Sequence, residues 1–242
     1  MTTAVKVAAF GSCRIFTPLA RAQSQGLVQT THKGIEWYTH STQEAIQKAD
    51  IVECRREVPE EILPLLIDTA DKYHADAHDR DKFVDTDIIV LELSTLKRIQ
   101  YDGWQLQQWR VARLMDGSAT DAPEESIRIA RASERTELSA DEFLSLLEDF
   151  RIRMGKPLLI VPHLTCASFS EPVLRPRLKI RRLVEKFREC HDDVAMYDPT
   201  PTVVSHGVQI ALIDSGHYEP AFNKVIGTEM GEACRQLQMQ CV

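Results

Sequence analysis

The stretch Ala4-Val5-Lys6-Val7-Ala8-Ala9-Phe10, followed by Gly11-Ser12-Cys13-Arg14, decides the fold class of this chain. Its first seven residues are mostly apolar and show little alternation, a pattern typical of a strand covered on both faces in a parallel sheet. Glycine and small residues permit a sharp turn at the carboxyl end of such a strand, where α/β folds bind ligands. Pro18 is then expected to open a helix that continues to Gln25 and ends at Gly26.

Strand and helix patterns alternate along the rest of the chain. Further strands are expected at 86–94, 157–163 and 194–199, and helices from Ser41 and over 59–73, 139–154, 174–190 and the segment from Asn223. This alternation predicts a three-layer α/β/α sandwich with a mainly parallel sheet. The whole of 1–242 is expected to be a single domain, with a polar insertion around 98–137 that is a lid, an interface or a disordered segment.

Composition excludes several classes of function. The 242 residues carry a net charge of -7 with a pI near 5.6, which argues against general nucleic-acid binding. The sequence shows no apolar run of membrane-spanning length and no signal peptide. Its six cysteines are scattered without a CxxC pair, which indicates reduced thiols and a cytoplasmic location. The oligomeric state, including a homo-oligomer, stays open.

Two short motifs point to acyl chemistry. A side chain on the turn after the first strand faces helix amides, and Arg14 adds positive charge, so we expect Cys13 to be activated toward its thiolate form. Asp214-Ser215-Gly216-His217 supplies an acid and a base three residues apart. In this interpretation His217 takes the proton of Cys13, and Asp214 holds the imidazole tautomer. Ser12 is the alternative nucleophile, and its side chain should point away from that of Cys13.

These motifs resemble the SGNH/GDSL hydrolase superfamily, in the branch where Gly-Ser-Cys replaces the usual Gly-Asp-Ser turn. The resemblance covers most of the chain and implies Cys13 as nucleophile with the late Asp-x-x-His pair, Asp214 and His217. The chain departs from the family's pattern because the second block lacks its glycine and the third, at 91–95, lacks its asparagine. Substitute oxyanion donors are the amides of Cys13 and Arg14 and the side chains of Arg14, His40 and Ser94.

Other residues carry weaker expectations. His163 follows a predicted strand and a proline, so it is a candidate for substrate binding or an alternative base. His74 and His78 have the i,i+4 spacing of helix metal ligands, but the charged residues around them favour a solvated helix end, so we expect no metal. The basic run from Arg175 to Arg188 is typical of a solvated helix face, or of a helix that holds the phosphates of coenzyme A.

Three hypotheses follow for the function. The first is a hydrolase or acyltransferase that forms an acyl-enzyme on Cys13, needs no cofactor, and acts on a small-molecule or carbohydrate acyl substrate. The second is an acyltransferase with coenzyme A as acyl donor, in which His217 deprotonates the acceptor and Cys13 is not acylated. The third is a non-catalytic binding module on a degenerate SGNH fold, suggested by the missing asparagine.

Overall fold

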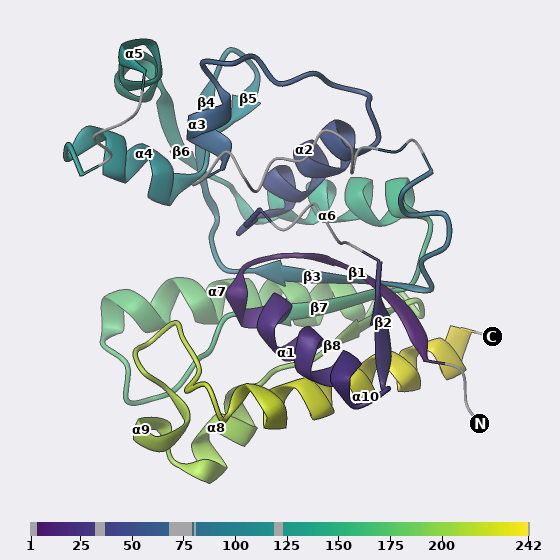
Figure 1. The fold of residues 1–242 in the computed structure, drawn as a ribbon. Coiled ribbons are helices and arrows are strands. Elements are labelled where there is room, and N and C mark those ends of the chain that lie inside the picture. Colours follow the sequence, from purple (N-terminus) through teal and green to yellow (C-terminus); the bar gives the residue numbers. More distant parts are fainter. Residues whose placement is uncertain (1–3, 32–36, 68–78, 80, 119–122, 242) are drawn as a thin grey trace.

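A parallel five-stranded sheet forms the centre of the protein, as the computed structural model shows for residues 4–31, 37–67, 79, 81–118 and 123–241 (Figure 1). The strand order is β2-β1-β3-β7-β8. The strands are β1 (Val5–Phe10), β2 (Val28–Thr30), β3 (Ile88–Leu93), β7 (Leu158–Pro162) and β8 (Val194–Met196). The strands predicted at 4–10, 86–94, 157–163 and 194–199 are confirmed, whereas the three-residue β2 was not predicted.

Each face of the sheet packs against its own layer of helices, which confirms the predicted α/β/α sandwich. Ala8 and Phe10 of β1 pack with side chains of α2 (Thr42–Val52), α6 (Ala140–Met154) and α7 (Glu171–Arg188). Val7 and Ala9 belong to the opposite cluster, with α1 (Cys13–Ser24), α8 (Thr200–His206) and α10 (Asn223–Cys241). The uniform burial of β3 explains why its sequence lacks alternation.

Helix α1 begins earlier than predicted. We expected Pro18 to open it, but Ser12 is the N-cap, since its side chain accepts a hydrogen bond from the amide of Arg14, and Pro18 lies inside the helix. The chain therefore enters the helix directly at Cys13. Gly227 of α10 packs against this helix so closely that a Cβ on it would lie 2.4 Å from the carbonyl oxygen of Pro18.

Most of the remaining helix boundaries follow their local signals. Ser139 and Glu142 form a capping box at the start of α6, where the helix was predicted to begin, and Gly155 ends that helix in the left-handed region. Ser41 caps α2, also as predicted. The helix predicted over 59–73 is wrong within its described part, which contains the single turn α3 (Leu63–Leu66), because Ile67 is extended; residues 68–73 lie outside the described residues.

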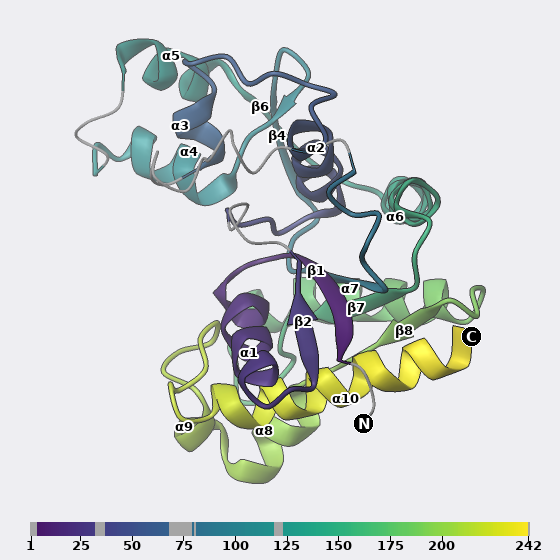
Figure 2. The ribbon, with the colours of Figure 1, turned by 45° about the vertical axis from the view of Figure 1, so that its right-hand side comes forward.

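The polar segment after β3 contains a second, smaller sheet. Its antiparallel order is β5-β4-β6, formed by β4 (Lys97–Tyr101), β5 (Trp104–Gln105) and β6 (Glu134–Glu137). Helices α4 (Gln108–Met115) and α5 (Glu124–Ala132) pack beside it, on the same side of the central sheet as α2 (Figure 2). A short α9 (Val208–Ala211) completes the described helices. That 98–137 is an insertion into a single domain stays a prediction.

Candidate active site

The turn after β1 positions Ser12 and Cys13 at the carboxyl edge of the central sheet. Gly11 is required there by close approach, because a Cβ on it would lie 2.4 Å from a carbon of Ile15 and 2.7 Å from Cβ of Glu92. Ser12 is buried, and its hydroxyl donates a 2.7 Å hydrogen bond to Glu92. Cys13, the first residue of α1, is partly exposed and lines a cavity. The two side chains therefore have different surroundings.

Glu92 organises this turn from the neighbouring strand β3. One of its carboxylate oxygens accepts hydrogen bonds of 2.7 Å from both the amide and the hydroxyl of Ser12. The other oxygen accepts from the guanidinium of Arg14 at 3.1 Å, in an ion pair whose side chains are 1% and 4% exposed. The turn is thus fixed by a buried charge pair between residues 78 positions apart in the sequence.

This pair changes the electrostatics that we predicted for Cys13. Burial, followed by the negative charge of Glu92, raises the pKa of the Cys13 thiol, and the opposing effect of Arg14 is smaller. The expectation of an activated thiolate is therefore wrong for the resting site, since burial and the charge of Glu92 together outweigh the effect of Arg14. At neutral pH Cys13 is a thiol and requires a base to become a nucleophile.

The acid and the base stand in direct contact. Nδ1 of His217 lies 2.8 Å from one carboxylate oxygen of Asp214 and 3.0 Å from the other. Burial acts to raise the pKa of Asp214, but hydrogen bonds from Gly216 and His217 outweigh it and hold this pKa below its ordinary value. Because an ionised carboxylate only accepts, Nδ1 carries the proton and Nε2 is left as a base. Both side chains are more than half exposed.

Cys13 and the acid–base pair share one cavity of about 390 Å³. Its lining also includes the ion-paired Arg14 and the largely buried Tyr218. The full lining is Cys13, Arg14, Thr17, Ile213, Asp214, His217, Tyr218 and Asn223. A thiol, a histidine base and its carboxylate around one small cavity are groups that can carry out acyl transfer.

Three other predicted site residues lie at the same sheet edge but outside the lining of this cavity. His40 and Ser94 contact each other, with Nδ1 of His40 3.3 Å from Oγ of Ser94. His163 borders the loop from Asp214 to His217, which we call the acid–base loop, since a Cβ on Gly216 would lie 4.0 Å from Nε2 of His163. Burial, followed by the positive charge of Arg14, lowers the pKa of His163 well below its ordinary value, so its imidazole is neutral at neutral pH.

The sequence analysis missed a residue that anchors the acid–base loop. Arg177 of α7 donates hydrogen bonds to the carbonyl oxygens of Ser215, at 2.8 Å, and Leu164, at 3.1 Å. Burial lowers its pKa to about 10, and its guanidinium lies 5.2 Å from the ring centre of Phe169. In the sequence Arg177 is only one member of a basic run. Its partners are backbone carbonyl groups of distant loops, and the sequence carries no signal for such contacts.

The described residues include no cluster of three or more His, Cys, Asp or Glu side chains that could hold a metal ion. His74 and His78, the pair with metal-ligand spacing, lie outside the described residues. None of the helices in the described ranges is both long and apolar enough to cross a membrane.

Matches to one family model cover most of the chain. The chain matches the TviD N-terminal domain family over residues 5–146 and 118–233. The Vi polysaccharide biosynthesis protein TviD of Salmonella typhi is 33% identical over 100 residues, which are 41% of this chain and 11% of that protein. The chain thus aligns with about a tenth of the length of this curated relative.

Solved structures show the fold. A protein from Desulfitobacterium hafniense DCB-2, assigned to the G-D-S-L family of lipolytic proteins, superposes with a TM-score of 0.52 at 9% identity, covering 94% of this chain and 98% of that one. An acetyl-xylooligosaccharide esterase, Axe2 from Geobacillus, gives a TM-score of 0.49 at 11% identity over 98% and 96% of the two chains. The first similarity confirms the predicted SGNH-hydrolase fold.

Proposed function

Because this chain belongs to the TviD N-terminal domain family and has the SGNH-hydrolase fold, we propose that it is an acyl hydrolase or acyltransferase with Cys13 as its nucleophile. One observation carries the choice of nucleophile. Cys13 lines the cavity that also contains Asp214 and His217, whereas the hydroxyl of Ser12 is buried against Glu92. The geometry therefore favours Cys13 over Ser12.

The mechanism follows from the contacts at the cavity. Nε2 of His217 takes the proton of the Cys13 thiol as Sγ attacks the acyl carbonyl carbon, and Asp214 stabilises the imidazolium that forms. The oxyanion of the tetrahedral intermediate develops at the N-terminus of α1, where the Cys13 amide can donate. Collapse expels the leaving group with the proton from His217 and leaves a thioester on Cys13. Water, or an acceptor hydroxyl or amine deprotonated by His217, then attacks that thioester, and the thiolate of Cys13 leaves and takes the proton back from His217.

A second route is favoured by the raised pKa of Cys13, which keeps the resting side chain a neutral thiol. In this route the acyl group passes directly from coenzyme A to an acceptor hydroxyl, His217 removes the acceptor proton, and Cys13 is never acylated. The third hypothesis, a non-catalytic module, gains no support from the intact contact between Asp214 and His217.

We propose that the molecule that carries or accepts the acyl group is a carbohydrate. This proposal is supported by the name of the relative from Salmonella typhi, which assigns that protein to polysaccharide biosynthesis, and by an exposed acid–base pair that leaves room for a bulky ligand. A cytoplasmic location, with reduced cysteines, is part of the same proposal, and all six cysteines in the described ranges are unpaired.

Intact-mass spectrometry tests the proposal. The protein is incubated with acyl-coenzyme A compounds and activated esters, and wild type is compared with Cys13→Ala and with the matched variant Cys166→Ala, whose cysteine is buried outside the cavity. We expect an acyl adduct on wild type and Cys166→Ala but not on Cys13→Ala. Turnover that survives Cys13→Ala would instead establish the direct route through His217.

A further inference from the structure

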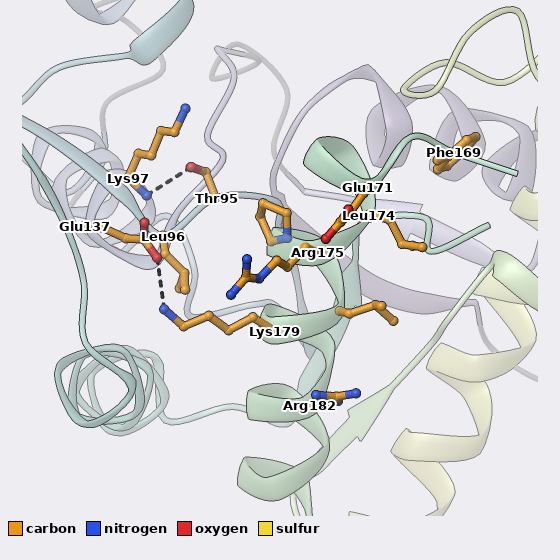
Figure 3. A pocket seen from close by; sticks show the side chains of 12 residues that line it. Thr95, Leu96, Lys97, Glu137, Phe169, Glu171, Leu174, Arg175, Lys179 and Arg182 are labelled. Carbon is orange, nitrogen blue, oxygen red and sulfur yellow. Dashed lines mark hydrogen bonds and ion pairs between the residues drawn. The ribbon is translucent and has the colours of Figure 1, made fainter. Parts of the chain in front are cut away.

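A second cavity lies beside the candidate active site, between the first turns of α7 and the small antiparallel sheet (Figure 3). Its volume is about 840 Å³, roughly twice that of the cavity at Cys13. We call it the α7 groove. It is lined by Thr95, Leu96, Lys97, Glu137, Phe169, Glu171, Leu174, Arg175, Pro176, Leu178, Lys179 and Arg182.

The α7 groove is cationic although the chain as a whole is acidic. Arg175, Lys179 and Arg182 follow one another at helical spacing along α7, and Figure 3 shows Lys97 on the opposite wall. Lys179 forms a 2.9 Å ion pair with Glu137. In the part of the chain that the structure describes, the side chains of Arg175, Arg182 and Lys97 have no such partner, and all three are exposed. Their charge is available to a ligand.

The rest of the lining adds apolar surface. Leu96, Leu174 and Leu178 line the groove together with the charged side chains. Arg175 and Arg182 are seven residues apart, which corresponds to about 10 Å along a helix. A ligand that contacts both cations and the apolar lining has at least two anionic groups on an elongated body.

The groove ends close to the catalytic machinery. Phe169 forms that end, and the guanidinium of Arg177 lies over its ring while donating to the carbonyl oxygen of Ser215, between Asp214 and His217. At the other wall, the amide of Thr95 donates to the carbonyl oxygen of His40. A ligand in the α7 groove therefore lies next to the loop that holds the acid–base pair.

We propose that the α7 groove binds an elongated anionic co-substrate of the acyl reaction, one that carries two or more phosphate or carboxylate groups. The inference rests on the proposed function and makes it more specific, because a dedicated site for a second ligand is a property of a transferase and not of a simple hydrolase. Phosphates would come from the acyl donor, and carboxylates from the acceptor. Both would be held by Arg175, Arg182 and Lys97 through charge-assisted hydrogen bonds.

Binding is measured by isothermal titration calorimetry on Cys13→Ala, in which no acyl-enzyme can form. The probes are coenzyme A, for phosphates, and a trigalacturonate, for carboxylates. We expect at least one probe to bind, and we expect the double variant Arg175→Glu/Arg182→Glu to weaken it about tenfold or more, because attraction becomes repulsion. The control Lys186→Glu/Arg188→Glu reverses two exposed charges of the same helix outside the groove and should weaken binding less than about twofold.

The two probes identify the source of the charge. Binding of coenzyme A alone assigns the groove to the donor, and binding of the trigalacturonate alone assigns it to the acceptor. Binding of neither probe, or equal weakening by both double variants, overturns the inference. Failure of the proposed function has a different signature: charge-dependent binding in the groove would persist while wild type forms no adduct and shows no turnover with any acyl donor.

Discussion

Glu92→Ala tests whether a buried carboxylate holds the turn at Gly11–Arg14 in place. The substitution removes the acceptor of three hydrogen bonds, from the Ser12 amide, the Ser12 hydroxyl and the Arg14 guanidinium. It also leaves the charge of Arg14, whose side chain is 4% exposed, without its partner. The expected result is a large loss of stability, because an unpaired buried charge costs more than the pair contributes.

The magnitude follows from the burial of the pair. Breaking a buried ion pair on one side costs about 3–5 kcal/mol in the free energy of unfolding. For a domain of this size about 1 kcal/mol corresponds to 2–4 °C in Tm, so we expect Tm to fall by roughly 6–20 °C. The control is Glu232→Ala, which breaks a pair with Arg235 whose side chains are 49% and 29% exposed. It should cost less than about 1 kcal/mol.

Circular dichroism during urea and thermal unfolding measures both variants against wild type. The double variant Glu92→Leu/Arg14→Met should be more stable than Glu92→Ala, since it leaves no buried charge behind. If Glu92→Ala lost no more stability than Glu232→Ala, the carboxylate would not be what holds the turn, and another contact would have to fix Ser12 and Arg14.

Three further predictions concern other parts of the site and fold. His217→Ala should slow iodoacetamide labelling of Cys13 at pH 7.5, because the thiol has a raised pKa and loses its base. Mass spectrometry over a time course measures this rate, and an unchanged rate would show that His217 does not act as the base for Cys13. Gly227→Ala should lower stability by about 1–3 kcal/mol in urea unfolding, because its Cβ would meet a backbone carbonyl of α1 at 2.4 Å, whereas the exposed Lys224→Ala should not. Arg177→Ala should reduce kcat about tenfold or more with little change in Tm, because it releases the acid–base loop, and partial rescue by Arg177→Lys would separate positioning from a loss of folding.

The pH dependence of Cys13 labelling has a definite sign. The raised pKa means that the labelling rate keeps increasing above the pH at which an ordinary thiol is fully ionised. The folded state prefers the protonated thiol, so its contribution to stability is present below the unfolded-state pKa and is lost as pH rises through the folded-state value. Glu92→Gln removes the negative charge that helps to raise this pKa, so its labelling profile should move to lower pH.

Local signals in the sequence were sufficient to predict strand β1 and the contact between Asp214 and His217. The apolar run of β1 predicts a buried parallel strand, and the three-residue spacing of Asp214 and His217 predicts their contact, which the structure shows at 2.8 Å. These features depend on residues that are close in sequence. The start of α1 was misplaced because Pro18 outweighed Ser12 in our prediction, although a serine cap needs only the amide two residues ahead.

The features that the sequence did not reveal all depend on distant partners. Glu92 could be seen only as a charged residue within an apolar strand, a position that is costly unless a cation meets it. Arg14 supplies that cation from 78 positions away. Burial of Cys13 and the negative charge of Glu92 together outweigh the effect of Arg14, so the pKa of Cys13 is raised and not lowered as predicted. The third block, at 91–95, thus lacks the family's asparagine but contains Glu92, which has a structural role of its own. The block carries a carboxylate that fixes the turn at Ser12 and Cys13 and opposes formation of the thiolate.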